Sequence, residues 1–284
     1  MKKQHTWILF LVGPPALWLG LLFVVPLITM VLFTFRSGSF GAEREIFTLA
    51  HYQRYLGSTA YHRLLWSSTV LALVISLLSV ILAYPVAYFL AFRAGNLRFT
   101  FLLAIVIPAW ISFLLRIFAW KLILGSGGVL NSLLLSSGLI REAVPLLLYS
   151  RSAVIVALVY VYIPFVALPI FVALQRIDRS LLEAAADLGG AAGQTFIRVT
   201  FPLSLPGVIA GFLLIFIPTL GEYVTPLLVG GTGSLMYGNL IHTQFSRALN
   251  WPLGSLMSVV MLLMTLATLF IFCRLVQMRD WVNS

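Results

Sequence analysis

Six long apolar stretches constrain the fold of this chain more than any other feature of its sequence. Each is long enough to cross the hydrocarbon core of a bilayer as a helix, which takes about 20 apolar residues. A transmembrane β-strand would instead alternate polar and apolar residues over about ten positions. The sequence therefore predicts an all-α integral membrane protein with six transmembrane helices, near residues 7–35, 64–92, 99–123, 152–174, 205–229 and 255–277.

Charged residues are too few for a water-soluble domain. They make up 9% of the chain, whereas globular domains are about 25% charged. The net charge is +10, but the Lys and Arg residues are spread over every loop, which argues against nucleic acid as a partner. Basic residues commonly flank membrane helices, so membrane lipid is the expected surrounding. We expect residues 1–284 to form a single transmembrane domain.

Motifs of nucleotide-hydrolysing, metal-dependent and serine enzymes are missing from the sequence. A P-loop ends in Gly-Lys-Ser or Gly-Lys-Thr, and none of the lysines, Lys2, Lys3 and Lys121, follows a glycine. The four histidines lack metal-ligand spacing, and no Gly-x-Ser-x-Gly motif occurs. We therefore expect a chain that is not an enzyme, with no catalytic residue, no metal and no cofactor.

The distribution of Lys and Arg residues between the two sides of the membrane gives a weak indication of orientation. An even number of spans places both termini on one side of the membrane. With the termini inside, nine Lys and Arg residues lie in cytoplasmic segments and seven lie outside, and short cytoplasmic loops generally carry more of them. We expect both termini and the loop 175–204 to be cytoplasmic.

The loop 175–204 contains most of a segment that is rich in small residues. This segment, residues 181–207, reads LLEAAADLGGAAGQTFIRVTFPLSLPG. Ser180 is expected to cap a helix that runs to Leu188, with Glu183 three residues after the cap as in a capping box. Gly189 and Gly190 are expected to end this helix.

A second short helix is expected after the glycines, with Phe196, Val199 and Phe201 on its apolar side. Pro202 and Pro206 should break it before the fifth span. The result is a compact elbow of two helices that fits a groove on another protein. The alternative, a solvated linker, would carry more charge and less alanine.

Part of this elbow resembles a known motif. Glu183-Ala184-Ala185, then Gly189, then Val199-Thr200-Phe201-Pro202 is similar to the EAA motif of permease subunits of ATP-binding-cassette (ABC) importers. Val199 and Phe201 replace the usual Ile and Leu of that family, and both remain apolar. The resemblance implies that Glu183, Ala184, Ala185, Gly189 and Pro202 belong to a coupling helix region that docks on an ATPase subunit.

Further segments, in order along the chain, resemble the spermidine/putrescine permease group of these importers. They include FTLAHYQRYL, LAYPVAYFLA, GGVLNSLLLSSGLI, YIPFVALPIFVALQRIDRSLLEAAADLGG and GNLIHTQFSRALNWPLGS. The resemblance implies a type I ABC importer permease-like bundle in the bacterial inner membrane. It also implies a second homologous permease subunit, two ATP-binding subunits that hold ATP and Mg²⁺, and a periplasmic or extracellular substrate-binding protein.

Two alternatives stay open at this point. The chain is either a permease for a polyamine or a permease for another small solute, such as an amino-acid derivative, an opine or an oxyanion. A self-sufficient channel or secondary transporter, which needs no ATPase partner, belongs to a different class. Co-elution with an ATPase separates the importer from this second class.

Arg116 and Glu222 are the charged side chains of interest within the expected spans, where ionisable groups are costly and are usually paired or line a path. We expect Arg116 to be structural, bonding carbonyls or an acid, because a cation would repel a polyamine. Contact with substrate is the alternative.

Glu222 lies in IPTLGEYVTPLL, residues 217–228, between Pro218 and Pro226, which should unwind the helix and expose carbonyl groups. With the aromatic ring of Tyr223, the carboxylate forms a candidate path site for an ammonium group. The alternative is an ion pair with Arg116 or with the second permease.

Overall fold

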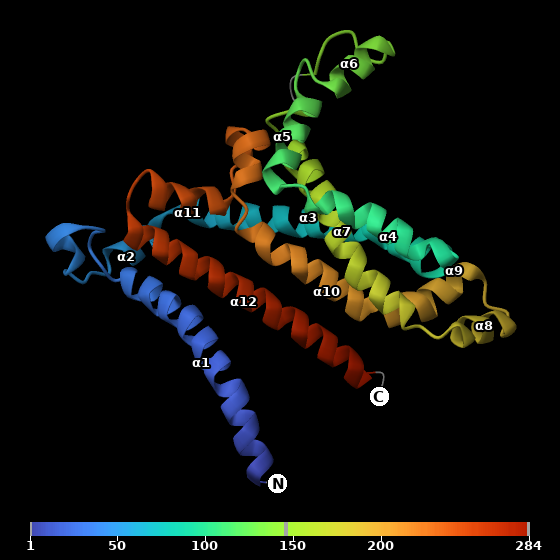
Figure 1. Ribbon diagram of the computed structural model, residues 1–284. Helices are drawn as coiled ribbons and strands as arrows, with labels where there is room; N and C mark the ends of the chain where they lie inside the picture. The colour runs from blue at the N-terminus through green and yellow to red at the C-terminus, as the bar shows by residue number, and fades with distance from the viewer. Residues whose placement is uncertain (1, 145–146, 283–284) are drawn as a thin grey trace. The chain divides into compact units, whose positions relative to one another are not determined.

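The computed structural model describes residues 2–144 and 147–282, which fold almost entirely into helices (Figure 1). The side chains of residues 2–10, 273 and 275–282 lie outside this description. The basic side chains Lys2, Lys3 and Arg279, which contribute to the expected orientation, are therefore not among those described.

The described chain divides into two compact units, and whether residues 1–284 act as the single transmembrane domain that we expect stays a prediction. One unit joins Met1–His62 to Leu240–Ser284, and the other comprises Arg63–Asn239. Hydropathy along the chain does not show this division, because apolar spans look alike whichever helices they pack against.

The first unit contains α1 (Lys2–Phe33), α2 (Ala50–Gly57) and α12 (Trp251–Val282), and α12 packs on both others. The hydroxyl of Ser39 holds the residues before α12. It donates to the carbonyl oxygen of Leu249 at 2.6 Å and accepts from the backbone N–H of Trp251 at 2.8 Å. The indole of Trp251 lies among three phenylalanine rings, Phe33, Phe40 and Phe245.

The second unit is built on α7, whose residues are the most completely buried of the membrane-length helices. Its core includes Ile75, Ile117, Val154, Leu158 and Val229. The helices of this unit are α3 (Thr59–Phe92), α4 (Arg98–Val106), α5 (Phe113–Leu124), α6 (Val129–Ser136), α7 (Arg151–Gln175), α8 (Arg179–Asp187), α9 (Ala192–Thr195) and α10 (Phe201–Leu220), with α11 (Tyr237–Ser246) at its boundary.

Small residues bring α7 and α10 into close contact. Gly207 and Gly211 are four residues apart on α10, a spacing that lets the backbones of membrane helices approach. A Cβ atom added to Gly207 would overlap Ala173 and would lie 2.5 Å from the carbonyl oxygen of Pro169. The interface therefore requires glycine at this position.

Within the described residues, six helical segments are long and apolar enough to cross a membrane. The spans are Leu11–Phe33, Thr59–Phe92, Phe113–Ser136, Arg151–Gln175, Ala192–Leu220 and Trp251–Phe272. Their number agrees with the sequence prediction, and four lie close to the expected positions.

The third span differs from the expected 99–123. The helix is interrupted at Ile111 and Ser112, whose ψ angles are 142° and 133°. Pro108, which lacks an N–H and cannot continue a regular helix, lies in the 3₁₀ turn just before them. The segment Gly95–Trp110 is consequently too short to cross a membrane alone, and the span is displaced to Phe113–Ser136.

The fifth span also differs, because Pro202 and Pro206 do not break it. The helix begins at Ala192, passes through a π-helical turn, η5 (Phe196–Thr200), and continues to Leu220. A proline ring crowds the carbonyl group four residues earlier, and the wider π turn directly before Pro202 accommodates it.

Candidate functional site

The elbow helix α8 begins at a different cap from the one predicted. The side chain of Asp178, not that of Ser180, caps it by accepting the backbone N–H of Ser180 at 3.0 Å. Hydrogen bonding to Ser180 also lowers the pKa of the Asp178 carboxyl from its ordinary value. Glu183 is then the fifth helical residue, too far along the helix for a capping box. Asp and Ser are equally good caps, so the sequence alone did not separate them.

The other end of α8 is the predicted one. Gly189 has a φ angle of 80°, a left-handed conformation that glycine adopts at little cost. Its N–H donates to the carbonyl of Ala186 at 2.9 Å, and the N–H of Gly190 donates to that of Ala185 at 3.0 Å. This is the Schellman arrangement of a helix C-terminus.

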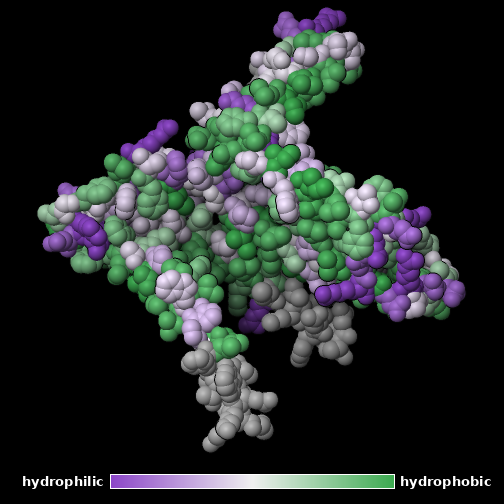
Figure 2. Space-filling view, viewed as in Figure 1, coloured by the Kyte–Doolittle hydropathy of each residue, from purple (hydrophilic) through white to green (hydrophobic). Residues whose placement is uncertain are grey.

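The outer surface of the elbow presents an apolar side chain that the sequence analysis did not single out. Leu188 is 89% exposed, more than any other large apolar side chain described. Glu183 and Ala184 are exposed beside it, and hydrophilic residues surround this end of the unit (Figure 2). A hollow of about 250 Å³ adjoins Leu188, lined by Ala185, Leu188, Gly189, Gly190, Gln194, Thr195, Arg198 and Val199.

Aromatic rings connect the elbow to α3. The Tyr84 hydroxyl and the Ser204 hydroxyl are hydrogen-bonded at 2.8 Å. The Tyr84 ring also lies against Phe196 and Phe201, with ring centroids 5.6 and 5.9 Å apart. Pro202 lies in this junction at the start of α10 and does not line the hollow beside Gly189.

The helix is interrupted at Glu222, as the flanking prolines predict. α10 ends at Leu220, and the chain turns before a π-helical turn, η6 (Pro226–Gly230). Glu222 Oε1 accepts the backbone N–H groups of Val224 and Thr225, both at 2.9 Å. Glu222 therefore lies two residues beyond the fifth span rather than within it, because that span begins and ends earlier than expected.

Residues 236–239 hold the chain at this break. The Asn239 side chain donates to the carbonyl oxygen of Tyr223 at 2.7 Å and accepts the N–H of Met236 at 2.9 Å. An added Cβ on Gly238 would lie 2.5 Å from the Gly221 carbonyl oxygen. We expected the break to expose backbone carbonyl groups, but the carbonyl group of Tyr223 accepts a hydrogen bond within the chain.

Glu222 is half-buried. Tyr162 of α7 lies close enough to interact with both Thr219 and the Glu222 carboxylate. The buried hydroxyl of Thr225 has no hydrogen-bond partner among the described residues. Both N–H groups bond Oε1, and no hydrogen bond to the second carboxylate oxygen is found among the described residues.

Arg116 does not have the partners that we expected. It is 9% exposed, and its buried Nε atom forms no hydrogen bond within the described chain. No ion pair joins it to Glu222 in that part of the chain, although α5 packs on η6, the turn after Glu222. The structure thus brings the two segments together but does not pair their charges.

The described residues include no group of three or more His, Cys, Asp or Glu side chains arranged for a metal ion.

Comparison with known proteins gives close relatives. No protein-family model matches the chain. The spermidine/putrescine transport system permease protein PotB of Salmonella typhimurium (strain SL1344) is 35% identical over 274 residues, which cover 96% of this chain and 93% of the relative. The protein of the same name from Escherichia coli (strain K12) is 37% identical over 231 residues, 81% and 83% of the two chains.

Solved structures show a similar fold. A bacterial ABC transporter involved in the import of the acidic polysaccharide alginate gives a TM-score of 0.72 at 17% identity, covering 96% of this chain and 97% of that one. A bacterial alginate ABC transporter in complex with a periplasmic protein bound to an alginate pentasaccharide gives 0.71 at 15% identity, covering 94% and 92%. At these identities the likeness concerns the fold.

Proposed function

Because the chain belongs to the family of the spermidine/putrescine transport permease PotB and has the fold of an ABC importer permease, we propose that it forms part of the path by which a polyamine crosses the membrane. It is a multi-pass protein of the inner membrane. A second, homologous permease subunit would complete the path.

The observation that carries the substrate assignment is the geometry of Glu222. Its carboxylate is held by two backbone N–H groups through Oε1, which leaves Oε2 for a ligand. Tyr223 beside it is 38% exposed, and an aromatic face attracts an ammonium group. A fixed carboxylate next to an aromatic ring suits a primary or secondary amine of a polyamine.

The elbow supports the second part of the proposal, dependence on a separate ATPase. Leu188 projects from the end of α8 with 89% of its surface exposed, and burying an apolar side chain of this size against a partner protein would favour association. We assign Glu183, Ala184, Ala185 and Gly189 to this docking surface and Pro202 to the junction behind it. ATP and Mg²⁺ are then held by the ATPase subunits, and this chain itself catalyses no reaction.

In the assembly that we propose, both termini and the elbow face the cytoplasm. Two ATP-binding subunits contact the elbows of the two permeases, and a periplasmic or extracellular substrate-binding protein delivers the polyamine at the other side. The alginate transporter in complex with its periplasmic protein supports this arrangement by fold.

Purification and reconstitution test the proposal. We expect the chain to co-purify with an ATPase subunit, and Leu188→Ser to weaken that association while Leu181→Ser, a control on the same helix, leaves it intact. In proteoliposomes, uptake of radiolabelled spermidine or putrescine should require ATP and the binding protein.

Three outcomes would contradict it. Gradient-driven flux by this chain without an ATPase would indicate a channel or secondary transporter. ATP-dependent uptake of an amino-acid derivative, an opine or an oxyanion in preference to polyamines would contradict the polyamine assignment. It would still agree with an ABC importer permease. Equal ATPase association of the two leucine variants would reject Leu188 as the anchor.

A further inference from the structure

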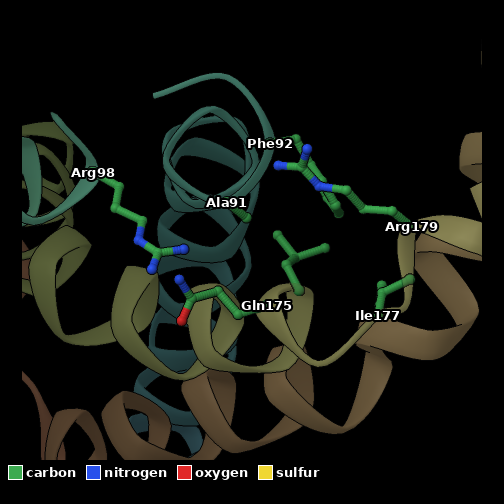
Figure 3. Close-up of a pocket in the computed structure, with 7 residues that line it drawn as sticks. Ala91, Phe92, Arg98, Gln175, Ile177 and Arg179 are labelled. Carbon is green, nitrogen blue, oxygen red and sulfur yellow. The ribbon is translucent and has the colours of Figure 1, made fainter. Parts of the chain in front are cut away.

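A second hollow in the larger unit lies where α3 ends and where α4 and α8 begin. Its volume is about 260 Å³. Figure 3 shows the side chains that line it: Ala91, Phe92, Arg98, Leu174, Gln175, Ile177 and Arg179. It is distinct from the hollow beside Leu188 and from the break at Glu222, since it shares no lining residue with either.

The polar groups of this hollow are suited to an anion. Arg98 extends toward Gln175, and Arg179 enters from the opposite side near Phe92 (Figure 3). Neither guanidinium forms an ion pair within the described chain, although Arg98 also lies over the Phe99 ring at 5.0 Å. Arg98 and Arg179 are the first residues of α4 and α8, where helix dipoles favour negative charge.

Acidic side chains do not line the hollow. The nearest acid along the chain is Asp178, next to Arg179, and its carboxylate accepts the N–H of Ser180. The positive charge in the hollow is therefore not neutralised by a carboxylate on its wall.

The rest of the hollow and its surroundings are apolar. Leu174 and Ile177 are buried in its wall. Beyond Arg98, α4 carries Phe99, Phe101 and Leu103, which are 56%, 41% and 56% exposed. The helical segment of α4 is apolar but too short to cross a membrane, so its exposed side chains offer a surface along which acyl chains can lie.

We propose that this hollow binds the phosphate headgroup of an anionic phospholipid, with its acyl chains along α4. Basic pockets between the ends of membrane helices are suited to such headgroups. Two guanidiniums bind the phosphate, and the Gln175 amide donates a hydrogen bond. The exposed apolar side chains of α4 favour a lipid over an acidic segment of a protein partner, which would need no such side chains. The inference is independent of the transported solute.

Native mass spectrometry of the full chain in detergent tests the proposal with phosphatidylglycerol as the probe. We expect Arg98→Gln and Arg179→Gln each to weaken phosphatidylglycerol binding roughly fivefold, and the double variant more than tenfold. Arg98→Lys should retain most of the affinity because it keeps the charge. Arg93→Gln is the matched control, since Arg93 is exposed near the end of α3 but does not line the hollow.

Two further probes identify the source of the phosphate. Phosphatidylcholine, which has a phosphate but no net charge, should bind equally to wild type and to all variants. Inorganic phosphate should displace phosphatidylglycerol poorly. Equal phosphatidylglycerol affinity in wild type and the double variant would overturn the proposal. The proposal would also be overturned if inorganic phosphate displaced phosphatidylglycerol as effectively as added lipid does. The same holds if the arginine variants lost ATPase association while their lipid binding stayed unchanged.

Discussion

Two single residues, Asp178 and Gly189, fix the ends of α8 by different properties. Asp178 supplies a carboxylate that accepts an otherwise unbonded N–H, and Gly189 supplies a backbone conformation with a φ angle of 80°. Glu183, which the sequence placed in a capping box, has no such role at the helix start. The start and end of α8 are thus set by Asp178 and Gly189, and not by Glu183.

Replacing Asp178 tests the cap directly. Asp178→Ala should speed hydrogen–deuterium exchange at the amide of Ser180, whereas Asp178→Asn, which can still accept this bond, should not. Asp187→Ala, at the last residue of the same helix, is the control. Equal exchange in wild type and Asp178→Ala would show that the cap does not order the helix.

The same cap predicts a pH dependence. The pKa of Asp178 is lowered in the folded chain, so its stabilising effect is complete above the ordinary value of about 3.9. The effect is lost as the pH falls through the lower, folded value. Exchange at Ser180, corrected for intrinsic rates, should rise in that acidic range in wild type and not in Asp178→Asn.

Gly189→Asp should uncouple ATP hydrolysis from transport. A side chain in left-handed backbone geometry costs about 1 kcal/mol, and the added charge stands at the docking surface. The chain itself leaves open space around an added Cβ, so membrane insertion should survive. Gly193→Asp, which also has open space but lies in helical geometry, is the control. Wild-type uptake by Gly189→Asp would exclude a coupling role.

At the scale of elements, one π-helical turn precedes α10 and another follows it. η5 precedes Pro202 next to the elbow, and η6 begins at Pro226 after the break at Glu222. Between them, α10 is held on α7 by close packing at Gly207 and Gly211. Such turns occur often at functional sites; here η5 lies between α10 and the elbow, and η6 follows the break at Glu222.

Gly207→Ala tests this packing. A Cβ atom would overlap Ala173, and overpacking of this kind costs about 1–3 kcal/mol. The thermal midpoint of the purified chain in detergent should fall. Ala210→Leu, on the exposed side of the same helix, should leave it near the wild-type value. Equal midpoints for Gly207→Ala and wild type would mean that α7 and α10 can separate without cost.

The sequence predicted which elements exist better than where they stop. Continuous hydrophobicity identified six spans, but it did not show the break at Ile111 and Ser112, which is a matter of backbone angles. The break at Glu222 was predictable because Pro218 and Pro226 flank it. That its carboxylate bonds two backbone N–H groups was not, because this depends on how the chain turns after Gly221.

Residues that meet only in three dimensions were also beyond the sequence. Arg98 and Arg179 are 81 positions apart and line one hollow, and no local pattern connects them. Leu188 is one of many leucines, and only the folded elbow shows that it is exposed. Arg116 illustrates the reverse case, since the expected bonds to carbonyls or to Glu222 are not formed within the described chain.

For the whole molecule, the orientation in the membrane remains a prediction. In a Cys273→Ser background, a membrane-impermeant maleimide added to intact cells should label Ser137→Cys, at the end of α6, and not Gln194→Cys in the elbow. Both positions are exposed, so accessibility within the chain does not bias the comparison. Labelling of Gln194→Cys alone would place the elbow outside the cell membrane and show that the predicted orientation is wrong.

The central claim, that Glu222 forms a cation site on the path of an ATP-driven polyamine importer, is tested most directly by Glu222→Gln. The glutamine oxygen can still accept the N–H groups of Val224 and Thr225, so the break keeps its structure while the charge is lost. A charge pair at about 4 Å contributes on the order of 4 kcal/mol at an effective dielectric constant near 20, before desolvation.

The measurement is ATP-dependent uptake of radiolabelled spermidine by proteoliposomes that contain the purified complex. For Glu222→Gln we predict a decrease of at least about tenfold, with complex yield and basal ATP hydrolysis near wild type. Glu142→Gln, an exposed acid in the segment after α6, should transport normally. Unchanged uptake by Glu222→Gln, or a complex that no longer assembles, would contradict the claim.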